Sequence, residues 1–224
     1  MLLKIIGDIH GEYDVFHLDE LKADLPFTAI QIGDFGFYPG AEYMDSWIPT
    51  EYPLYFIDGN HEHFRYLKDE CESVMQEPDG TYQLRENLFY IPRGTILTFG
   101  SAKIGFLGGA ESVDKAWRRE RESWFHEERI TEEDVEKFKN REVDLLITHS
   151  PPANFIKRNF SPINREYWRL PPTWEDISSQ RVEQVWGMLG MPRIISGHFH
   201  KSIVDGQGTI LNINEVLDIH VEDE

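Results

Sequence analysis

Short apolar runs alternate along the chain with longer polar stretches, and each run ends in glycine or in a polar residue. Runs rich in isoleucine, leucine and phenylalanine are typical of buried strands when turn-forming residues bound them. These runs predict the sheet framework of the fold. We therefore expect strands within residues 2–8, 27–34, 52–61, 94–99, 102–109, 143–150 and 192–200.

The polar stretches between the runs are long enough to form helices. We expect helices within residues 12–24, 130–140 and 177–189. The first of these places Val15, Leu18 and Leu21 at helical spacing. In the second, Thr131 is followed three residues later by Asp134, which predicts a capping box at the start of the helix.

Strands that alternate with helices are typical of a layered α/β domain. Residues 202–214 predict a hairpin around Asp205 to Gly208, so part of the sheet is expected to be antiparallel. Residues 111–175 are rich in tryptophan, arginine and proline, and they predict an insertion or long loops over the edge of the sheet. The sequence contains no internal repeat, so we expect a single domain over residues 1–224.

The net charge of the chain limits the classes of partner that it can bind. The 40 acidic and 22 basic residues give a formal net charge of −18 at pH 7. Such a surface repels polyphosphate backbones, which disfavours extended nucleic acid as a partner. A small anionic substrate remains compatible with this charge, because metal ions can set the local potential of a cleft.

Cysteine content and hydropathy indicate the compartment. Cys71 is the single cysteine, which excludes an internal disulfide and a zinc-thiolate cluster. The apolar stretch at the start is too short for a signal peptide, and no run is long enough to span a bilayer. We therefore expect a cytoplasmic protein that does not interact with membranes.

Metal-ligating side chains follow five of the predicted strands. In an open α/β sheet, ligands bind outside the carboxyl ends of the strands, because successive loops converge there. Glycines beside these side chains allow tight turns and close approach of the backbone. The candidate residues are Asp8, His10, Asp34, Asn60, His61, His149, His198 and His200.

The chemistry of this set points to a pair of metal ions. Imidazole, carboxylate and carboxamide groups without thiolate suit borderline divalent ions such as Mn, Fe, Zn, Co or Ni, and Mn is our first expectation. The candidates outnumber the ligands of one tetrahedral ion, so a two-metal site fits them better. Two adjacent ions activate water and stabilise both the attacking and the leaving oxygen of a phosphoryl displacement.

The ordered motifs Asp8-x-His10, Gly33-Asp34, Gly59-Asn60-His61-Glu62, His149 and Gly197-His198-x-His200 resemble the calcineurin-like metallophosphoesterase superfamily. The resemblance covers almost the whole chain. It implies a β-sandwich of mixed sheets flanked by helices in four α/β/β/α layers, and a dinuclear centre that hydrolyses phosphate esters with metal-activated water.

The resemblance also implies a role for each motif residue. Asp8, His10 and His200 would hold the first ion, Asn60, His149 and His198 the second, and Asp34 would bridge both. His61 would be the catalytic histidine beside the leaving group, which donates a proton to it or binds a phosphate oxygen.

Two positions depart from the pattern of the protein phosphatases in this superfamily. Phe37 stands where those enzymes carry an aspartate that orients the catalytic histidine. Asp58 stands before Gly-Asn-His, where the phosphatases and related dinucleoside-polyphosphate hydrolases carry an arginine. We expect Asp58 to repel phosphate. Both differences argue against a serine/threonine protein phosphatase.

Other side chains are candidates for contact with the substrate. Arginine forks match phosphate oxygens, so Arg65, Arg118 and Arg119 are candidate phosphate ligands, and His63 is a candidate at the rim of the cleft. A charge run such as the one around 118 is also typical of a solvated face. Aromatic residues could stack on a nucleobase or pack in the core: Tyr38, Trp117, Trp168 and Trp174.

The main hypothesis is a phosphoesterase for small esters, with cyclic or linear nucleotide phosphodiesters slightly favoured. A nuclease of the same superfamily would have to overcome the negative charge with a local basic groove. A protein phosphatase is disfavoured by positions 37 and 58. A catalytically silent binding or scaffold module is disfavoured because every motif ligand is present.

Overall fold

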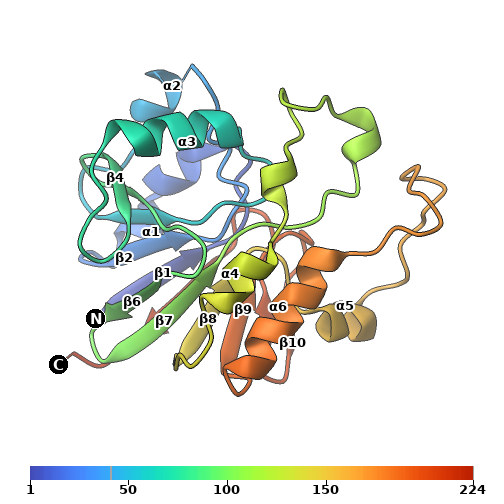
Figure 1. The fold of residues 1–224 in the computed structure, drawn as a ribbon. Coiled ribbons are helices and arrows are strands. Elements are labelled where there is room, and N and C mark those ends of the chain that lie inside the picture. The colour runs from blue at the N-terminus through green and yellow to red at the C-terminus, as the bar shows by residue number, and fades with distance from the viewer. Residues whose placement is uncertain (41, 224) are drawn as a thin grey trace.

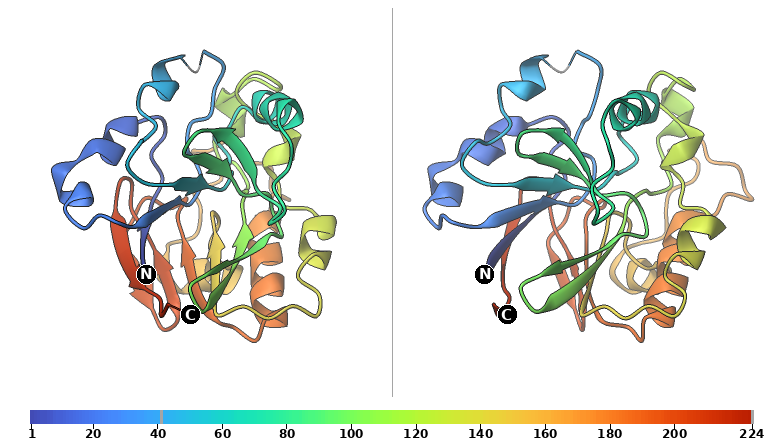
Figure 2. Two further views of the ribbon diagram at one scale, coloured as in Figure 1. Left: turned by 90° about the vertical axis from the view of Figure 1, so that its left-hand side faces the viewer. Right: turned by 60° about the vertical axis from the view of Figure 1, so that its left-hand side comes forward.

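The computed structural model describes residues 1–40 and 42–223, and it contains two six-stranded sheets packed face to face (Figures 1 and 2). Helices lie on the outer faces of both sheets, and the two ends of the chain lie near each other at one edge of the sandwich (Figure 2). No helix among the described residues has the length and apolar character that crossing a membrane requires.

The first sheet has a parallel centre with antiparallel edges. Strands β1, β2, β3 and β5 run parallel, and β12 and β4 pair antiparallel at the two sides. Its order is β12 (Val216–His220), β1 (Leu2–Ile6), β2 (Thr28–Gln31), β3 (Leu54–Phe56), β5 (Leu88–Tyr90) and β4 (Tyr82–Arg85).

The second sheet repeats this plan. Strands β7, β8, β9 and β11 are parallel, and β6 and β10 pair antiparallel at the edges. The β10–β11 pair is the hairpin that residues 202–214 predict. The order is β10 (Ile203–Asp205), β11 (Gly208–Ile210), β9 (Arg193–Ser196), β8 (Leu145–Thr148), β7 (Ala102–Leu107) and β6 (Ile96–Phe99).

Alternation of side chains along the strands produces separate cores on the two faces of each sheet. Leu145 and Ile147 of β8 pack between the sheets, in one cluster with Leu3 of β1. Leu146 points the other way and packs beside Val182 of α6. Because both faces are covered, the central strands are mostly apolar, although β1 and β2 also bury Lys4 and Gln31.

Two groups of helices complete the layers. On the first sheet, Phe16, Leu21 and Leu67 of these helices pack against the outer face. This arrangement confirms the predicted four-layer α/β/β/α fold. The helices of the first group are η1 (Tyr13–His17, a 3-10 helix), α1 (Asp19–Lys22), α2 (Glu42–Asp45) and α3 (Phe64–Ser73). Those of the second are α4 (Glu132–Glu136), α5 (Ala153–Asn159) and α6 (Ile177–Met188).

The single helix expected over residues 12–24 is wrong. The chain forms η1 and α1 instead, separated by Leu18 in an extended conformation. Val15, Phe16 and Leu21 are all buried. At about 100° per residue, one continuous helix would point these three side chains in widely different directions, so the break lets them all reach the core. The other two predicted helices are present as α4, with its capping box, and α6.

The range 111–175, for which an insertion or long loops are expected, also contains the helix and the strand expected within 130–140 and 143–150. This range contains α4, α5 and β8, and β8 lies between β7 and β9 in the middle of its sheet. Irregular structure and two 3-10 turns, η2 (Lys115–Trp117) and η3 (His126–Glu128), occupy the part before α4. A second irregular segment lies between α5 and α6. Both segments extend beyond the sheets (Figure 1).

Candidate metal centre

The candidate ligands lie in turns that follow five parallel strands. The turns after β1, β2 and β3 belong to the first sheet, and those after β8 and β9 to the second. Backbone hydrogen bonds connect these turns within each sheet: the Ile9 amide donates to the Asp34 carbonyl, and the Gly197 amide donates to the His149 carbonyl. Across the sandwich, the His198 amide donates to the carboxylate of Asp8 at 3.0 Å. The loops therefore converge at one end of the two sheets.

Two groups of ligand atoms form there and share one carboxylate. Asp8, His10, Asp34 and His200 make up the first group, whose ligand atoms lie within 4.8 Å of one another. The second group joins Asp34 to His149 and His198 within the same limit. Asn60 extends it, because its Oδ1 lies 3.2 Å from Nε2 of His149.

The donor groups fit divalent ions. Asp8 and Asp34 are fully buried, and neither pairs with a lysine or arginine among the described residues. In the first group, Nε2 of His10 lies 3.0 Å from Nε2 of His200, so two imidazole nitrogens converge on one point beside Asp8. Buried carboxylates need a cation, and converging imidazole and carboxylate donors suit borderline divalent metals.

The electrostatics of the second group follow from its burial. Burial opposes ionisation of Asp34, but nearby histidines outweigh it and hold the pKa of this carboxyl well below its usual range. Burial also lowers the pKa of His149, but Asp34 and Asp8 outweigh it and raise that pKa to about 10. His198 is desolvated beside His149, which lowers its pKa to about 3. The site thus attracts positive charge.

Backbone conformation is unusual at four of the candidate ligands. His10, Asp34, His198 and His200 have φ angles of +46°, +54°, +67° and +50°. Residues other than glycine rarely adopt this left-handed region, and such positions cluster at functional sites. The neighbouring backbone must also come close: a β-carbon on Gly59 would collide with the carboxylate of Asp34. The tight turns therefore bring the ligands together.

A comparison with models of protein families identifies the family to which the chain belongs. The model of the calcineurin-like phosphoesterase family matches residues 1–202, which include every candidate ligand. The chain belongs to this family. No curated protein matches it. Together with the two ligand groups, the family identifies a metal-dependent hydrolase of phosphoric esters.

In this phosphoesterase, His61 lies beside the ligand groups without belonging to either. Its backbone amide donates to Asp34 Oδ1 at 2.7 Å, and its ring centroid lies 5.1 Å from that of His10. Nε2 of His61 lies 3.8 Å from a carboxylate oxygen of Asp114, in the segment between β7 and α4. Asp114 thus places a carboxylate near the ring of His61, and no local motif in the sequence predicts this contact.

Phe37 has a structural position instead. Its ring stacks on Phe56 and Tyr66 at centroid distances of 5.7 and 5.2 Å, inside the core of the first sheet. Glu62 holds the turn that leads to it, because its carboxylate accepts the amide hydrogens of Phe35 and Phe37 at 2.7 Å each. The motif glutamate therefore supports the turn that carries Asp34.

The predicted repulsion between Asp58 and phosphate is wrong. Asp58 is fully buried. It accepts a hydrogen bond from Arg93 Nε at 2.8 Å and another from the Tyr90 hydroxyl at 2.9 Å. Nη1 of Arg93 in turn donates to the carbonyl of Arg129. Asp58 therefore forms a buried ion pair that joins the turns after β3 and β5, and Arg93 connects this pair to the segment before α4.

The candidate substrate ligands have different surroundings. Arg119 is exposed, with 83% of its side chain accessible, and pairs loosely with a glutamate of its own segment. His63 caps α3, where its Nδ1 accepts the Tyr66 amide hydrogen. Arg65 lies on the exposed face of α3 and lines a cavity that contains none of the candidate metal ligands. None of these contacts involves the candidate ligands.

Arg118 is buried and contacts a candidate ligand. Its Nη2 donates to the backbone carbonyl of Asn60 at 2.9 Å, and its Nη1 donates to the hydroxyl of Ser112 at 2.7 Å. The same hydroxyl accepts from Asn60 Nδ2 at 3.0 Å, which turns the carboxamide oxygen toward His149. Ser112 and Arg118 together fix the orientation of Asn60.

Glu128 anchors the segment that carries these two residues. Its Oε1 accepts hydrogen bonds from the Ser112 amide at 3.1 Å and from Trp124 Nε1 at 2.7 Å. Its other oxygen lies 3.6 Å from Arg118 Nη1 and has no hydrogen-bond partner among the described residues. Burial raises the pKa of Glu128 to about 7.

Proposed function

We propose that this phosphoesterase hydrolyses small phosphate esters in the cytoplasm with two divalent ions, preferably Mn, and that it favours nucleotide phosphodiesters. The observation that carries the proposal is the pair of ligand groups that share Asp34. Asp8, His10 and His200 would hold one ion, and Asn60, His149 and His198 the other. Two such ions supply charge neutralisation for the phosphoryl group and activate water.

His61 is the proposed acid for the leaving group. It lies beside the first ligand group and is anchored through its backbone to the shared carboxylate. Burial lowers the pKa of His61, while the carboxylates of Asp34 and Asp114 favour the protonated ring. A protonated ring in this position can donate to the departing oxygen, and the nearby carboxylate of Asp114 would favour the protonated form.

The preference for nucleotides rests on an aromatic cluster beside the site. Trp117 precedes Arg118 and is 48% exposed, so it is not part of the core. Its ring lies 5.7 Å from that of Tyr167 and 5.2 Å from that of Trp168, both in the segment between α5 and α6. Exposed aromatic faces of this kind can stack on a nucleobase.

Hydrolysis of model esters tests the proposal. Metal-stripped protein would be assayed with bis-p-nitrophenyl phosphate and p-nitrophenyl phosphate, before and after addition of Mn. We expect Mn to restore cleavage, with the diester cleaved faster. His61→Ala should reduce the rate by about 10²-fold or more, since general acids contribute effects of that size. His220→Ala, on the exposed end of β12, is the matched control.

Each outcome bears on a separate part of the proposal. No turnover of either ester with Mn, Zn, Ni or Co, in protein that binds two ions, would contradict hydrolysis as the activity. Faster cleavage of the monoester would reject the diester preference. An unchanged rate in His61→Ala would remove His61 from the mechanism.

A further inference from the structure

A cavity lies outside the metal centre, between α3, the β4–β5 pair and residues 121–127. Its volume is about 650 Å³, within the range of about 300–1,000 Å³ that is usual for small-molecule sites. Its lining includes none of the candidate metal ligands. The phosphoesterase activity therefore does not account for this cavity.

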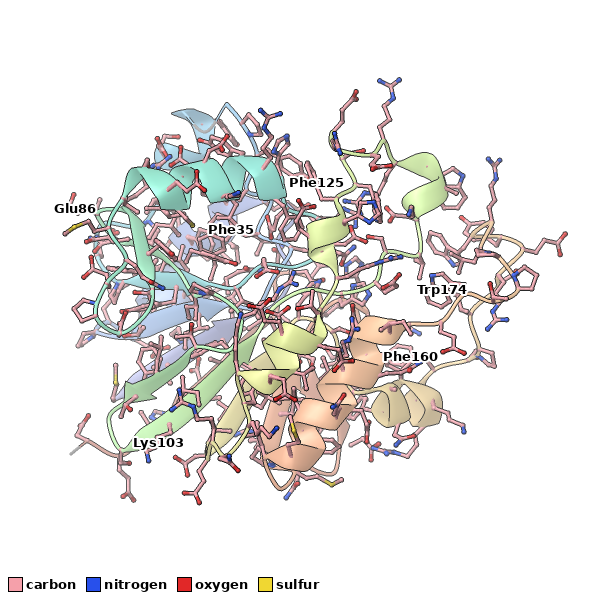
Figure 3. All side chains as sticks on the ribbon, in the orientation of Figure 1. Phe35, Glu86, Lys103, Phe125, Phe160 and Trp174 are labelled. Carbon is pink, nitrogen blue, oxygen red and sulfur yellow. The ribbon has the colours of Figure 1, made fainter. Side chains whose placement is uncertain are left out.

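The walls of the cavity are aromatic and apolar. Phe64 of α3 and Phe125 lie on one side, with their ring centroids 6.0 Å apart, and Tyr82 and Tyr90 line the cavity from β4 and β5. Figure 3 shows Phe125 between the start of α3 and the segment that leads to α4. Cys71 of α3 lines the cavity as well. Such walls favour a flat aromatic group, because ring pairs gain energy beyond the area they bury.

Basic side chains line the same cavity. Arg65, Lys68 and Arg121 contribute three positive charges against the one carboxylate of Glu127. This local excess is unusual in a chain with a net charge of −18. Neither Arg65 nor Arg121 forms an ion pair or a side-chain hydrogen bond with any residue in the described part of the chain, so both guanidinium groups can bind an anion.

The backbone at Arg121 supports a ligand-binding role. Arg121 has a φ angle of +64°, in the left-handed region that residues other than glycine rarely adopt. Its amide donates to the Trp124 carbonyl at 2.7 Å, which closes the turn that carries the arginine at the cavity. Strained turns of this kind are typical of binding sites.

We propose that this cavity binds a small aromatic anion, with the ring packed against Phe64 and Phe125 and a carboxylate or phosphoryl group held by Arg65 and Arg121. Guanidinium forks bind either anion through paired hydrogen bonds. Phe125 also contacts the ring of His63 at a centroid distance of 4.8 Å, so the cavity shares a wall with the residues next to His61. The proposal does not depend on the proposed function of the metal centre.

Titration with the fluorescent aromatic sulfonate 8-anilinonaphthalene-1-sulfonate tests the site. We expect saturable binding to the folded, metal-loaded protein and a loss of affinity of about tenfold or more in R65E/R121E. The matched control is K139E/K157E, which changes the net charge equally at exposed positions outside the cavity. The neutral pair R65Q/R121Q should give an intermediate loss, and it serves where charge reversal disturbs folding.

Competition identifies the anionic group. Benzoate and phenylphosphonate carry an aromatic ring with a carboxylate or a non-hydrolysable phosphoryl group, and displacement of the dye by one of them shows which anion the site prefers. Acetate and methylphosphonate lack the ring and should displace nothing at the same concentrations. Equal affinity of the dye for wild type and R65E/R121E, absence of saturable binding, or displacement by the ring-free anions would overturn the proposal.

Discussion

The candidate metal ligands lie in short turns at strand ends, and the segment before α4 (residues 108–131) contacts them from a distant part of the chain. Different features of the sequence place these two regions at the same site. Asp34 lies in a short turn at the end of β2, and the neighbouring sequence provides the glycine and the buried strand that the turn requires. Arg118 contacts Asn60 from 58 residues away in the chain, and its own sequence is that of a charged surface. Local sequence therefore identifies the ligands, and contacts between distant segments orient them.

Removal of the shared carboxylate should have the largest effect. In Asp34→Asn, both ligand groups lose the negative charge and one of the two oxygen donors that they share, so both ions are held more weakly. We expect the content of bound metal to fall and ester hydrolysis to drop by about 10³-fold or more. Metal analysis after dialysis measures the first effect, and Asp19→Asn on the exposed face of α1 is the control. Retention of one ion with near-normal activity would show that Asp34 does not bridge.

The same difference between local turns and distant contacts explains which site residues can be predicted from the sequence. Ligands such as Asp8 and His200 can be predicted because each lies within two to four residues of the end of a strand. The loops that follow parallel strands lie at the same edge of the sheet, so their side chains come together. The prediction for Asp58 fails for the opposite reason. Its partner Arg93 is 35 residues further along the chain, and the pairing of β3 with β5 brings the two together.

The segment before α4 shows why neighbouring residues cannot be separated by pattern alone. Arg118 and Arg119 have the same side chain and the same local sequence, and both were equal candidates for phosphate binding. In the folded chain one is buried against Asn60, and the other is in solvent. The path of the backbone around η2 decides between them, and nothing in the charge run encodes that path.

Replacement of each arginine sharpens this contrast. Arg118→Ala should lower kcat/KM and the affinity for the second ion by about 10- to 100-fold, as is usual for residues that orient metal ligands. Arg119→Ala should change neither by more than about twofold, since its ion pair is exposed. Steady-state kinetics and metal titration of the two variants measure the difference. Equal losses in both variants would reject the distinction.

A smaller effect is expected from the hydroxyl that joins Arg118 to Asn60. Ser112→Ala leaves Nδ2 of Asn60 without its acceptor, so the carboxamide can rotate away from His149. The affinity for the second ion should fall by about tenfold, and that for the first should not change. Calorimetric titration of metal-free protein resolves the two ions, with the exposed Ser101→Ala as the control. An unchanged second affinity would show that the hydroxyl does not hold the carboxamide.

The last expected effect is on stability and not on activity, and it concerns Glu128, the anchor of the segment before α4. Burial raises the pKa of Glu128 from an ordinary 4.5 to about 7, so between these pH values the folded chain holds a proton that the unfolded chain has lost. The free energy of unfolding must therefore fall as pH rises through this window, by up to about 3 kcal/mol at 1.36 kcal/mol per unit.

The side chain in Glu128→Gln is uncharged throughout this pH range, so the free energy of unfolding of the variant should fall less than that of the wild type. Urea unfolding at pH 5 and pH 7.5 measures the change in each protein, and the difference between wild type and variant isolates Glu128 from other buried carboxyls such as Glu62. Glu122→Gln, exposed in the same segment, should follow the wild type. Parallel behaviour of Glu128→Gln and wild type would mean that Glu128 is ionised in the folded chain, and that Arg118 compensates its burial.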